Sequence, residues 1–147
     1  MNNKNVFKRL KVKVQLIKDN PSEHCIILKT PEEVAKLAGY LRSKDREHLL
    51  CVHLSTRNTV LGIETVSIGS LNANIVHPRE VFKGAILNNA ASVILVHNHP
   101  SGSSEASEED IEITKRIVEA GKIIGIDVID HVIVGDKYVS MKEEGLM

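Results

Sequence analysis

The stretch that most constrains the fold is "SVILVHN", residues 92–98, the most continuously apolar run in the chain. A strand with this pattern is buried on both faces, so we expect it near the centre of a sheet. After the polar stretch "HPSGSSEAS", the sequence "EEDIEITKRIVEAGKIIG" has the periodicity of a helix that ends near Gly121 or Gly125. The middle of the chain is therefore expected to run from a central strand through a polar loop into a helix.

The flanking sequence also alternates between strand and helix patterns. Thr30 is a typical N-cap, because Pro31 follows it and Glu33 stands three residues further on. The expected elements are a helix over 30–43, an antiparallel hairpin over 47–68, a helix over 77–90 and a closing hairpin over 126–141 that turns at Gly135 and Asp136. The segment "VKVQLI", residues 12–17, alternates at period two and predicts one more strand.

Length and composition indicate one domain. With 147 residues, 42% of them hydrophobic, the chain can bury one core of ordinary size. We expect the domain to occupy residues 30–147, with residues 1–29 as an N-terminal strand or extension. There is no signal-peptide pattern and no apolar run of roughly 18 residues, the length that spans a bilayer. Cys25 and Cys51 then indicate free thiols in a reducing cytoplasm, with no disulfide and no membrane partner.

The charge distribution gives little support to nucleic-acid binding. The formal net charge is zero, and the basic residues gather mainly in the first eighteen positions. Such a patch either contacts a phosphate backbone or is simply a solvated terminal segment. It contains one aromatic residue, Phe7, and no glycine-rich phosphate loop follows it, which favours the solvated segment.

The end of the central strand carries the pattern of a metal site. His97 and His99 are two residues apart, so a strand would point both imidazoles to the same face. Asp110 lies one turn into the helix that starts at Ser107, where its carboxylate can reach back to the strand end. Two histidines, one aspartate and one open position are the arrangement of a catalytic rather than a structural zinc site.

Each part of this pattern also has a purely structural interpretation. Ser107 and Asp110 form the S-x-x-D of a capping box, which needs no metal. A histidine at a strand end is often only a hydrogen-bonded surface residue, and His131, in "IDVIDHVIV", is expected to be packed or hydrogen-bonded. The complete order H-x-H-P, then S-x-x-D, at a strand end and a helix start, favours the metal site.

The same residues resemble a known motif. His97, His99, Pro100, Ser107 and Asp110 match the JAMM motif of MPN-type zinc hydrolases. The surrounding sequence, over roughly residues 30 to 143, is similar to the RadC branch of that family. The resemblance implies an α/β MPN (JAB) domain, an α/β/α sandwich with a mixed sheet that is related to the cytidine deaminase fold. It also implies zinc held by the two histidines and Asp110.

The resemblance further implies a glutamate that acts as general base beside the metal. By position this is Glu47 in "REHLL", with Glu64 and Glu80 as the rivals; Glu80 stands at a helix N-terminus, which explains its charge without catalysis. Ser107 is expected both to cap its helix and to donate a hydrogen bond to a developing oxyanion. The implied reaction is hydrolysis of a peptide or isopeptide bond by water that zinc activates.

The substrate stays open among three classes of function. RadC proteins are traditionally associated with DNA repair, and longer members carry a helix-hairpin-helix region that the first thirty residues here cannot hold. The complete set of ligands, general base and serine favours a zinc-dependent peptidase or isopeptidase over a metal-dependent nuclease or a non-catalytic interaction domain. A homodimer stays open as well.

Overall fold

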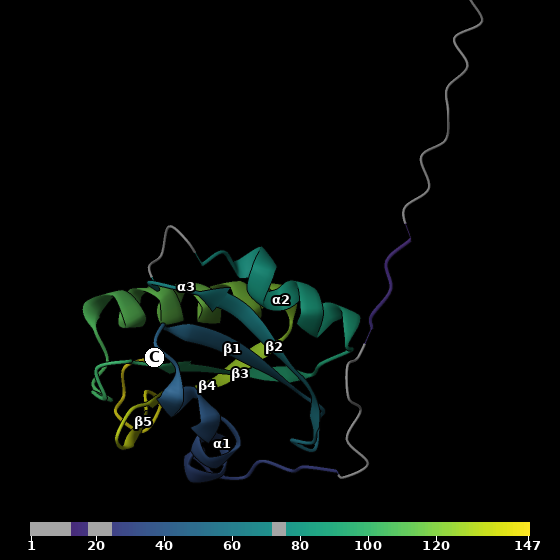
Figure 1. Cartoon of the computed structure of the whole chain (residues 1–147). Helices are drawn as coiled ribbons and strands as arrows, with labels where there is room; N and C mark the ends of the chain where they lie inside the picture. The colour runs from purple at the N-terminus through teal and green to yellow at the C-terminus, as the bar shows by residue number, and fades with distance from the viewer. Residues whose placement is uncertain (1–12, 18–24, 72–75) are drawn as a thin grey trace, which may run out of the picture.

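A computed structural model describes residues 13–17, 25–71 and 76–147 of the chain (Figure 1). Its centre is a five-stranded sheet with the order β2-β1-β3-β4-β5. The strands are β1 His48–Leu54, β2 Val60–Ile68, β3 Ser92–Asn98, β4 Asp127–Val134 and β5 Tyr138–Ser140. The helices are α1 Pro31–Leu37, α2 Pro78–Leu87 and α3 Glu108–Ile124, with a short 3-10 helix, η1, at Gly39–Ser43.

The sheet is mixed, and β3 is its middle strand. β1 pairs antiparallel with both β2 and β3, while β4 pairs parallel with β3 and antiparallel with β5. The parallel pair is joined through α3, as a parallel connection requires a crossover. Every residue of β3 is buried, so the prediction that "SVILVHN" is a central strand is confirmed.

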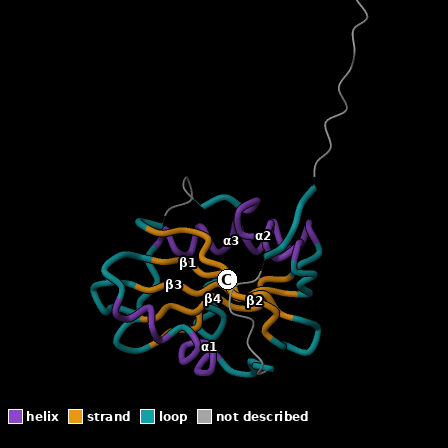
Figure 2. Tube along the Cα trace, turned by 45° about the vertical axis from the view of Figure 1, so that its right-hand side comes forward, coloured by secondary structure: helices purple, strands orange, loops and turns teal. Residues whose placement is uncertain are grey.

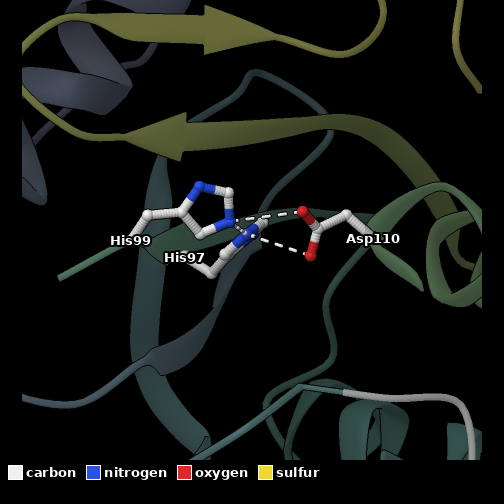
Figure 3. A group of neighbouring side chains, drawn as sticks. All are labelled: His97, His99 and Asp110. Atoms are coloured by element: carbon white, nitrogen blue, oxygen red, sulfur yellow. Dashed lines mark hydrogen bonds and ion pairs between the residues drawn. The ribbon is translucent and has the colours of Figure 1, made fainter. Parts of the chain in front are cut away.

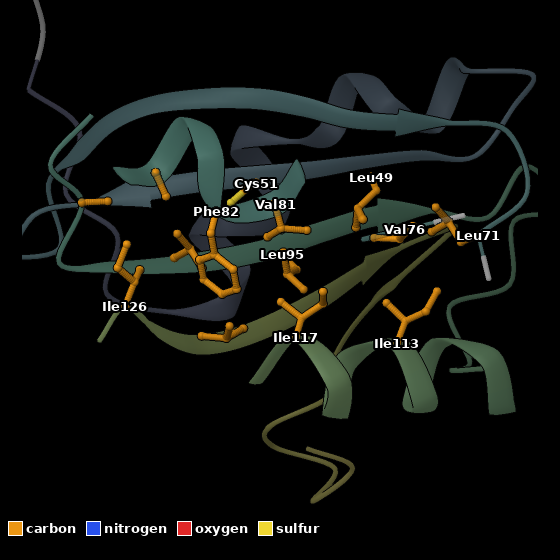
Figure 4. Packing of buried hydrophobic residues seen from close by; sticks show 14 residues of the cluster. Leu49, Cys51, Leu71, Val76, Val81, Phe82, Leu95, Ile113, Ile117 and Ile126 are labelled. Carbon is orange, nitrogen blue, oxygen red and sulfur yellow. The ribbon is translucent and has the colours of Figure 1, made fainter. Parts of the chain in front are cut away.

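Helices cover both faces of the sheet. α2 and α3 lie on one face and α1 lies on the other, a layering that both views show (Figures 1 and 2). Alternate residues of the central strands therefore serve two cores. The larger core lies on the α2 and α3 side, where Phe82, Ile113 and Ile117 pack with Leu95 (Figure 4). The expected α/β sandwich is confirmed.

The second core lies between the sheet and α1. It contains Val34, Ala35 and Leu41 from the helical segment, together with Leu50 and Val96 from the strands. The capping box at the start of α1 is present, since Thr30 Oγ1 accepts the Glu33 N–H and Glu33 Oε2 accepts the Thr30 N–H.

Helix ends differ in part from the sequence prediction. The helix expected over 30–43 is α-helical only to Leu37, because the chain tightens into η1 after Ala38. At the other end of the chain, α3 stops at Gly125, whose φ of 83° lies in the left-handed region that glycine adopts at little cost. The expected end of this helix is confirmed at the second of the two glycines.

One predicted strand is wrong where it can be checked. Val12 lies outside the described residues, and residues 13–17 form no strand. Val14 and Ile17 are 64% and 79% exposed, so the alternation of "VKVQLI" corresponds to no buried face. A strand needs a partner edge as well as an alternating pattern, and the pattern alone does not supply one.

Two further features are the state of the cysteine thiols and the length and polarity of the helices. Cys25 is exposed and Cys51 is buried in the larger core, and both are free thiols. Within the described ranges, the helices are all too short or too polar to cross a membrane.

Candidate metal centre

The end of β3 and the first turn of α3 bring three side chains together. His97 and His99 leave β3 toward the same point, and Asp110 reaches them from α3 (Figure 3). His97 Nε2 lies 3.2 Å from Asp110 Oδ1, and His99 Nε2 lies 3.2 Å from Asp110 Oδ2. The two Nε2 atoms are 2.9 Å apart. The three residues that the sequence pattern selected are therefore the three that converge.

These spacings fit a tetrahedral metal ion. Zinc binds imidazole nitrogen and carboxylate oxygen at about 2.0–2.1 Å, so neighbouring ligand atoms in a tetrahedron lie about 3.3 Å apart. Two separations, 2.9 Å between the two Nε2 atoms and 3.2 Å between His97 Nε2 and Asp110 Oδ1, are close to that value. The donor set of two imidazoles and one carboxylate suits a transition metal better than calcium or magnesium, which prefer oxygen. His97, His99 and Asp110 could therefore hold a metal ion.

Asp110 is held in place by the helix that it helps to start. Its Oδ2 accepts the Ser107 N–H at 2.8 Å, and Ser107 Oγ accepts the Asp110 N–H at 3.1 Å. Burial opposes ionisation of this carboxyl, but hydrogen bonds from His97 and His99 hold its pKa well below its usual range. The carboxylate is thus preformed as a charged ligand. The capping box and the metal site are two uses of the same residues.

The loop after β3 orients His99. Its Nδ1 lies 3.1 Å from the Ser103 carbonyl oxygen, which can only accept, so Nδ1 carries the proton and Nε2 faces the centre. Hydrogen bonding to Asp110 raises the pKa of His99 above its usual value. The loop itself rests on Gly135, where an added Cβ would lie 2.6 Å from the Ser103 carbonyl oxygen and still closer to that of Gly102.

This close approach gives a testable prediction. Gly135→Ala should push Ser103 away from His99 and weaken zinc binding by about 10- to 100-fold, the usual cost of losing an outer-shell partner of a ligand. The affinity would be measured by competition with a chromogenic chelator, with thermal melting as the check on the fold. Lys137→Ala, an exposed residue in the same turn, is the matched control and should bind zinc like the wild type. Wild-type affinity in Gly135→Ala would show that the loop does not hold His99.

A cleft of about 550 Å³ opens onto these ligands. Its walls include Glu47, Ser107 and Asp110, and also Leu71 and His99. Glu47 Oε2 accepts the Leu71 N–H at 2.9 Å, which orients the carboxylate in the cleft. Glu47 and Ser107, the two predicted catalytic residues, therefore line the same cleft as His99 and Asp110.

Asn98, between the two histidines, supports Glu47 from the opposite face of the strand. Its Oδ1 accepts the His48 N–H at 2.8 Å, and its Nδ2 donates to the Arg46 carbonyl at 3.0 Å. These two hydrogen bonds fix the backbone immediately before and after Glu47. Strand alternation places Asn98 on the face opposite His97, but it does not indicate these contacts with the backbone around Glu47.

The two rival glutamates lie elsewhere. Glu64 Oε2 is 3.7 Å from His53 Nε2, beneath α2, and Glu80 binds Lys83 on the exposed start of that helix. Among the described residues that line the cleft, neither of them occurs. A hydrogen bond from Lys83 also lowers the pKa of Glu80, which makes it a weaker base.

Two buried residues lie behind His97: His131, whose expected packing and hydrogen bonding are confirmed, and Thr114, for which the sequence pattern indicated no role. His131, on β4, places its Nε2 2.7 Å from His97 Nδ1, and its Nδ1 2.6 Å from Thr114 Oγ1. Burial holds the pKa of His131 well below its ordinary value, so this ring is neutral. The available signal was the polar pair Asp130-His131 inside the apolar strand sequence "IDVIDHVIV".

Comparison with known proteins places the chain in a family. The model of the RadC-like JAB domain matches residues 26–146. A UPF0758 protein of Desulforamulus reducens is 57% identical over 129 residues, which are 86% of this chain and 57% of that protein. A UPF0758 protein of Bacillus cereus is 55% identical over 80% of this chain and 53% of its own length. For one of Methanococcoides burtonii, the identity is 51% over 90% of this chain and 58% of the relative.

The chain thus spans a little more than half the length of these curated relatives. The family model extends across the strand end and the helix start that carry His97, His99 and Asp110. The five-stranded mixed sheet between helical layers agrees with the fold of that domain. The chain belongs to the RadC family, and its fold is that of an MPN (JAB) domain.

Proposed function

We propose that this chain is a zinc-dependent hydrolase of the JAMM type that cleaves an amide bond, either a peptide or an isopeptide. The observation that carries the proposal is the convergence of three ligand atoms, within 4.8 Å of one another, at a cleft that Glu47 and Ser107 also line. A structural zinc site would be closed by four protein ligands. Three ligands beside an open cleft favour a catalytic site.

His97, His99 and Asp110 would hold the zinc through the two Nε2 atoms and the carboxylate. When bound, zinc supplies Lewis acidity, which polarises a carbonyl group and lowers the pKa of water from about 15.7 toward about 7. Glu47 then has the role of general base and acid: it accepts a proton from the attacking water and returns it to the leaving nitrogen. The Leu71 N–H holds one carboxylate oxygen, Oε2, so Oε1 is the atom assigned to proton transfer.

Ser107 is assigned to the oxygen that becomes negative during the attack. Its Oγ accepts the Asp110 N–H, which leaves the hydroxyl proton to be donated into the cleft. A preorganised donor of this kind contributes roughly 2.7–4 kcal/mol to transition-state stabilisation in other hydrolases. Ser107 thus combines the capping of α3 with a hydrogen bond to substrate.

The charge of the cleft favours an amide over a phosphodiester. Its lining includes Glu47, Glu105, Glu109 and Asp110, and among the described residues of that lining there is no lysine or arginine. Proteins that bind nucleic acid neutralise phosphates with basic side chains. An acidic cleft repels the phosphate backbone and is compatible with a neutral or basic peptide.

The test is a substrate panel assayed with and without metal. A fluorogenic peptide library, an isopeptide-linked lysine substrate and single-stranded DNA would each be incubated with the zinc-loaded protein, and again after chelation. We expect amide cleavage that stops on chelation and returns with added zinc, while DNA stays intact. DNA cleavage without amide cleavage would replace the proposal with a nuclease. Full zinc content without any cleavage would favour an interaction domain.

A further inference from the structure

A chain of three short contacts runs from the backbone of α3 to His97. Thr114 Oγ1 lies 2.6 Å from the Asp110 carbonyl oxygen and 2.6 Å from His131 Nδ1, and His131 Nε2 lies 2.7 Å from His97 Nδ1. Thr114, His131 and His97 are at most 1% exposed. Water therefore does not compete for these contacts, and each must be satisfied by the groups named.

The chemistry of the groups decides where every proton lies. A carbonyl oxygen can only accept, so the Thr114 hydroxyl donates to Asp110. The Met141 thioether is a weak acceptor at 3.5 Å and does not compete. Because the hydroxyl has one proton, its contact with His131 is made by the Nδ1–H of that ring. Burial keeps the His131 ring neutral, so its Nε2 accepts the Nδ1–H of His97, and His97 Nε2 is the nitrogen that faces Asp110.

We propose that Thr114 and His131 are positioning residues that fix His97 in the tautomer with its proton on Nδ1, so that Nε2 faces the metal as a ligand. The inference rests on the metal centre of the proposed function and names the residues that orient one of its ligands, His97. Neither residue touches the ligand atoms; Thr114 acts through His131, and His131 acts through His97. Ligating histidines commonly donate their second nitrogen to a partner, and here that partner is another histidine.

The fold places His131 for this contact. The register of β4 against β3 shifts between the pairs Val93 with Val128 and Ile94 with Asp130, so Ile129 is one extra residue. Without the shift, strict alternation would put Val128 and His131 on opposite faces of the sheet. With it, Val128 packs in the core on the α3 side and His131 reaches His97 on that side.

Asp130 then anchors the backbone at this point. Its Oδ1 accepts the His131 N–H at 2.7 Å and the Lys142 N–H at 3.2 Å, and its Oδ2 accepts the Ser140 hydroxyl at 2.7 Å. The strand and the C-terminal segment are thereby tied together beside His131. The anchoring holds the backbone of His131 at the position from which its ring contacts His97.

The first test replaces the hydroxyl and leaves the shape. In Thr114→Val, His131 Nδ1 loses its acceptor, so His131 should carry its proton on Nε2 and donate it to His97 Nδ1, which then has no proton of its own. Long-range ¹H–¹⁵N spectra of the histidine rings in zinc-free protein report this tautomer directly. Zinc affinity should fall about 10- to 100-fold, because the ligand must change tautomer before it binds. Thr114→Ser keeps the hydroxyl and should show the wild-type histidine tautomers and the wild-type zinc affinity.

A second pair of variants tests His131 itself. His131→Gln keeps an acceptor for the His97 Nδ1–H, whereas His131→Leu has a similar volume and none. We expect zinc affinity to fall about 10- to 100-fold in the leucine variant and to recover largely in the glutamine variant. Thermal melting identifies any variant that loses affinity only because it unfolds. If the His131 variants unfold, the comparison of Thr114→Val with Thr114→Ser tests the inference.

Two results would overturn the inference. One is a wild-type spectrum in which His97 Nδ1 of the zinc-free protein carries no proton. The other is a folded Thr114→Val protein with both the tautomer and the zinc affinity of the wild type. If the wild type binds no zinc at all, the proposed function fails, but the spectra still decide whether Thr114 sets the tautomer of His97.

Discussion

Asp110→Asn is expected to abolish stoichiometric zinc binding while the protein stays folded. The asparagine side chain keeps an oxygen that accepts the Ser107 N–H, so α3 can still begin at its usual residue. It lacks the negative charge that lies 3.2 Å from both histidine Nε2 atoms, and a neutral amide is a poor ligand for zinc. The loss in affinity should exceed the roughly 100-fold change that outer-shell substitutions cause, which corresponds to more than about 2.7 kcal/mol.

The measurement is zinc content by atomic emission after dialysis, together with chelator competition and a thermal melt. Glu109→Gln is the matched control, since it removes one carboxylate from the same cleft without removing a ligand. This control should retain one zinc ion per chain. Full zinc content in Asp110→Asn would refute the assignment of Asp110 as a ligand, and unfolding of that variant would show that the cap needs the charge.

Glu47→Gln is expected to bind the metal like the wild type and to lose most of its hydrolytic activity on an amide substrate. Glutamine has nearly the same shape and can still accept the Leu71 N–H, so the wall of the cleft should be preserved. It cannot accept a proton from water at neutral pH. General base catalysis contributes about 10²- to 10⁴-fold, so kcat on an amide substrate should fall by that factor with a small change in KM.

The control for this variant is Glu105→Gln, because Glu105 lines the same cleft at a position without an assigned role. Both variants should contain zinc at the wild-type level. Hydrolysis by Glu47→Gln at the wild-type rate would remove Glu47 from the mechanism and leave the metal site intact. Loss of zinc from this variant would indicate that Glu47 supports the ligands rather than the reaction.

Features set by local pattern could be predicted from the sequence. The central strand could be predicted from the apolar run over residues 93–96, and all seven residues of β3 are buried in the structure. The start of α3 could be predicted from Ser107 and Asp110. The convergence of His97 and His99 follows from strand geometry alone. Each of these depends on residues close together in the chain, where spacing determines which side chains share a face.

Features that depend on pairing between distant segments could not be predicted. The contact of His131 with His97 requires the parallel pairing of β3 with β4 and the shift at Ile129, and neither has a local signature. Asn98 acts on Arg46 and His48 through the register of β1 against β3, which is likewise invisible in the sequence. The failure at residues 13–17 has the same origin, because alternation does not specify a partner strand.

The double use of Asp110 bears on how such a domain would lose its metal site during evolution. The residue begins a helix and supplies a ligand, so most substitutions there are penalised twice. Asparagine or glutamine would be tolerated best, since each keeps an amide oxygen that can accept the Ser107 N–H while giving up the charged ligand. A relative that has become catalytically silent should therefore keep an intact α3 and carry one of these residues at position 110, and a survey of homologous sequences could identify it by that single position.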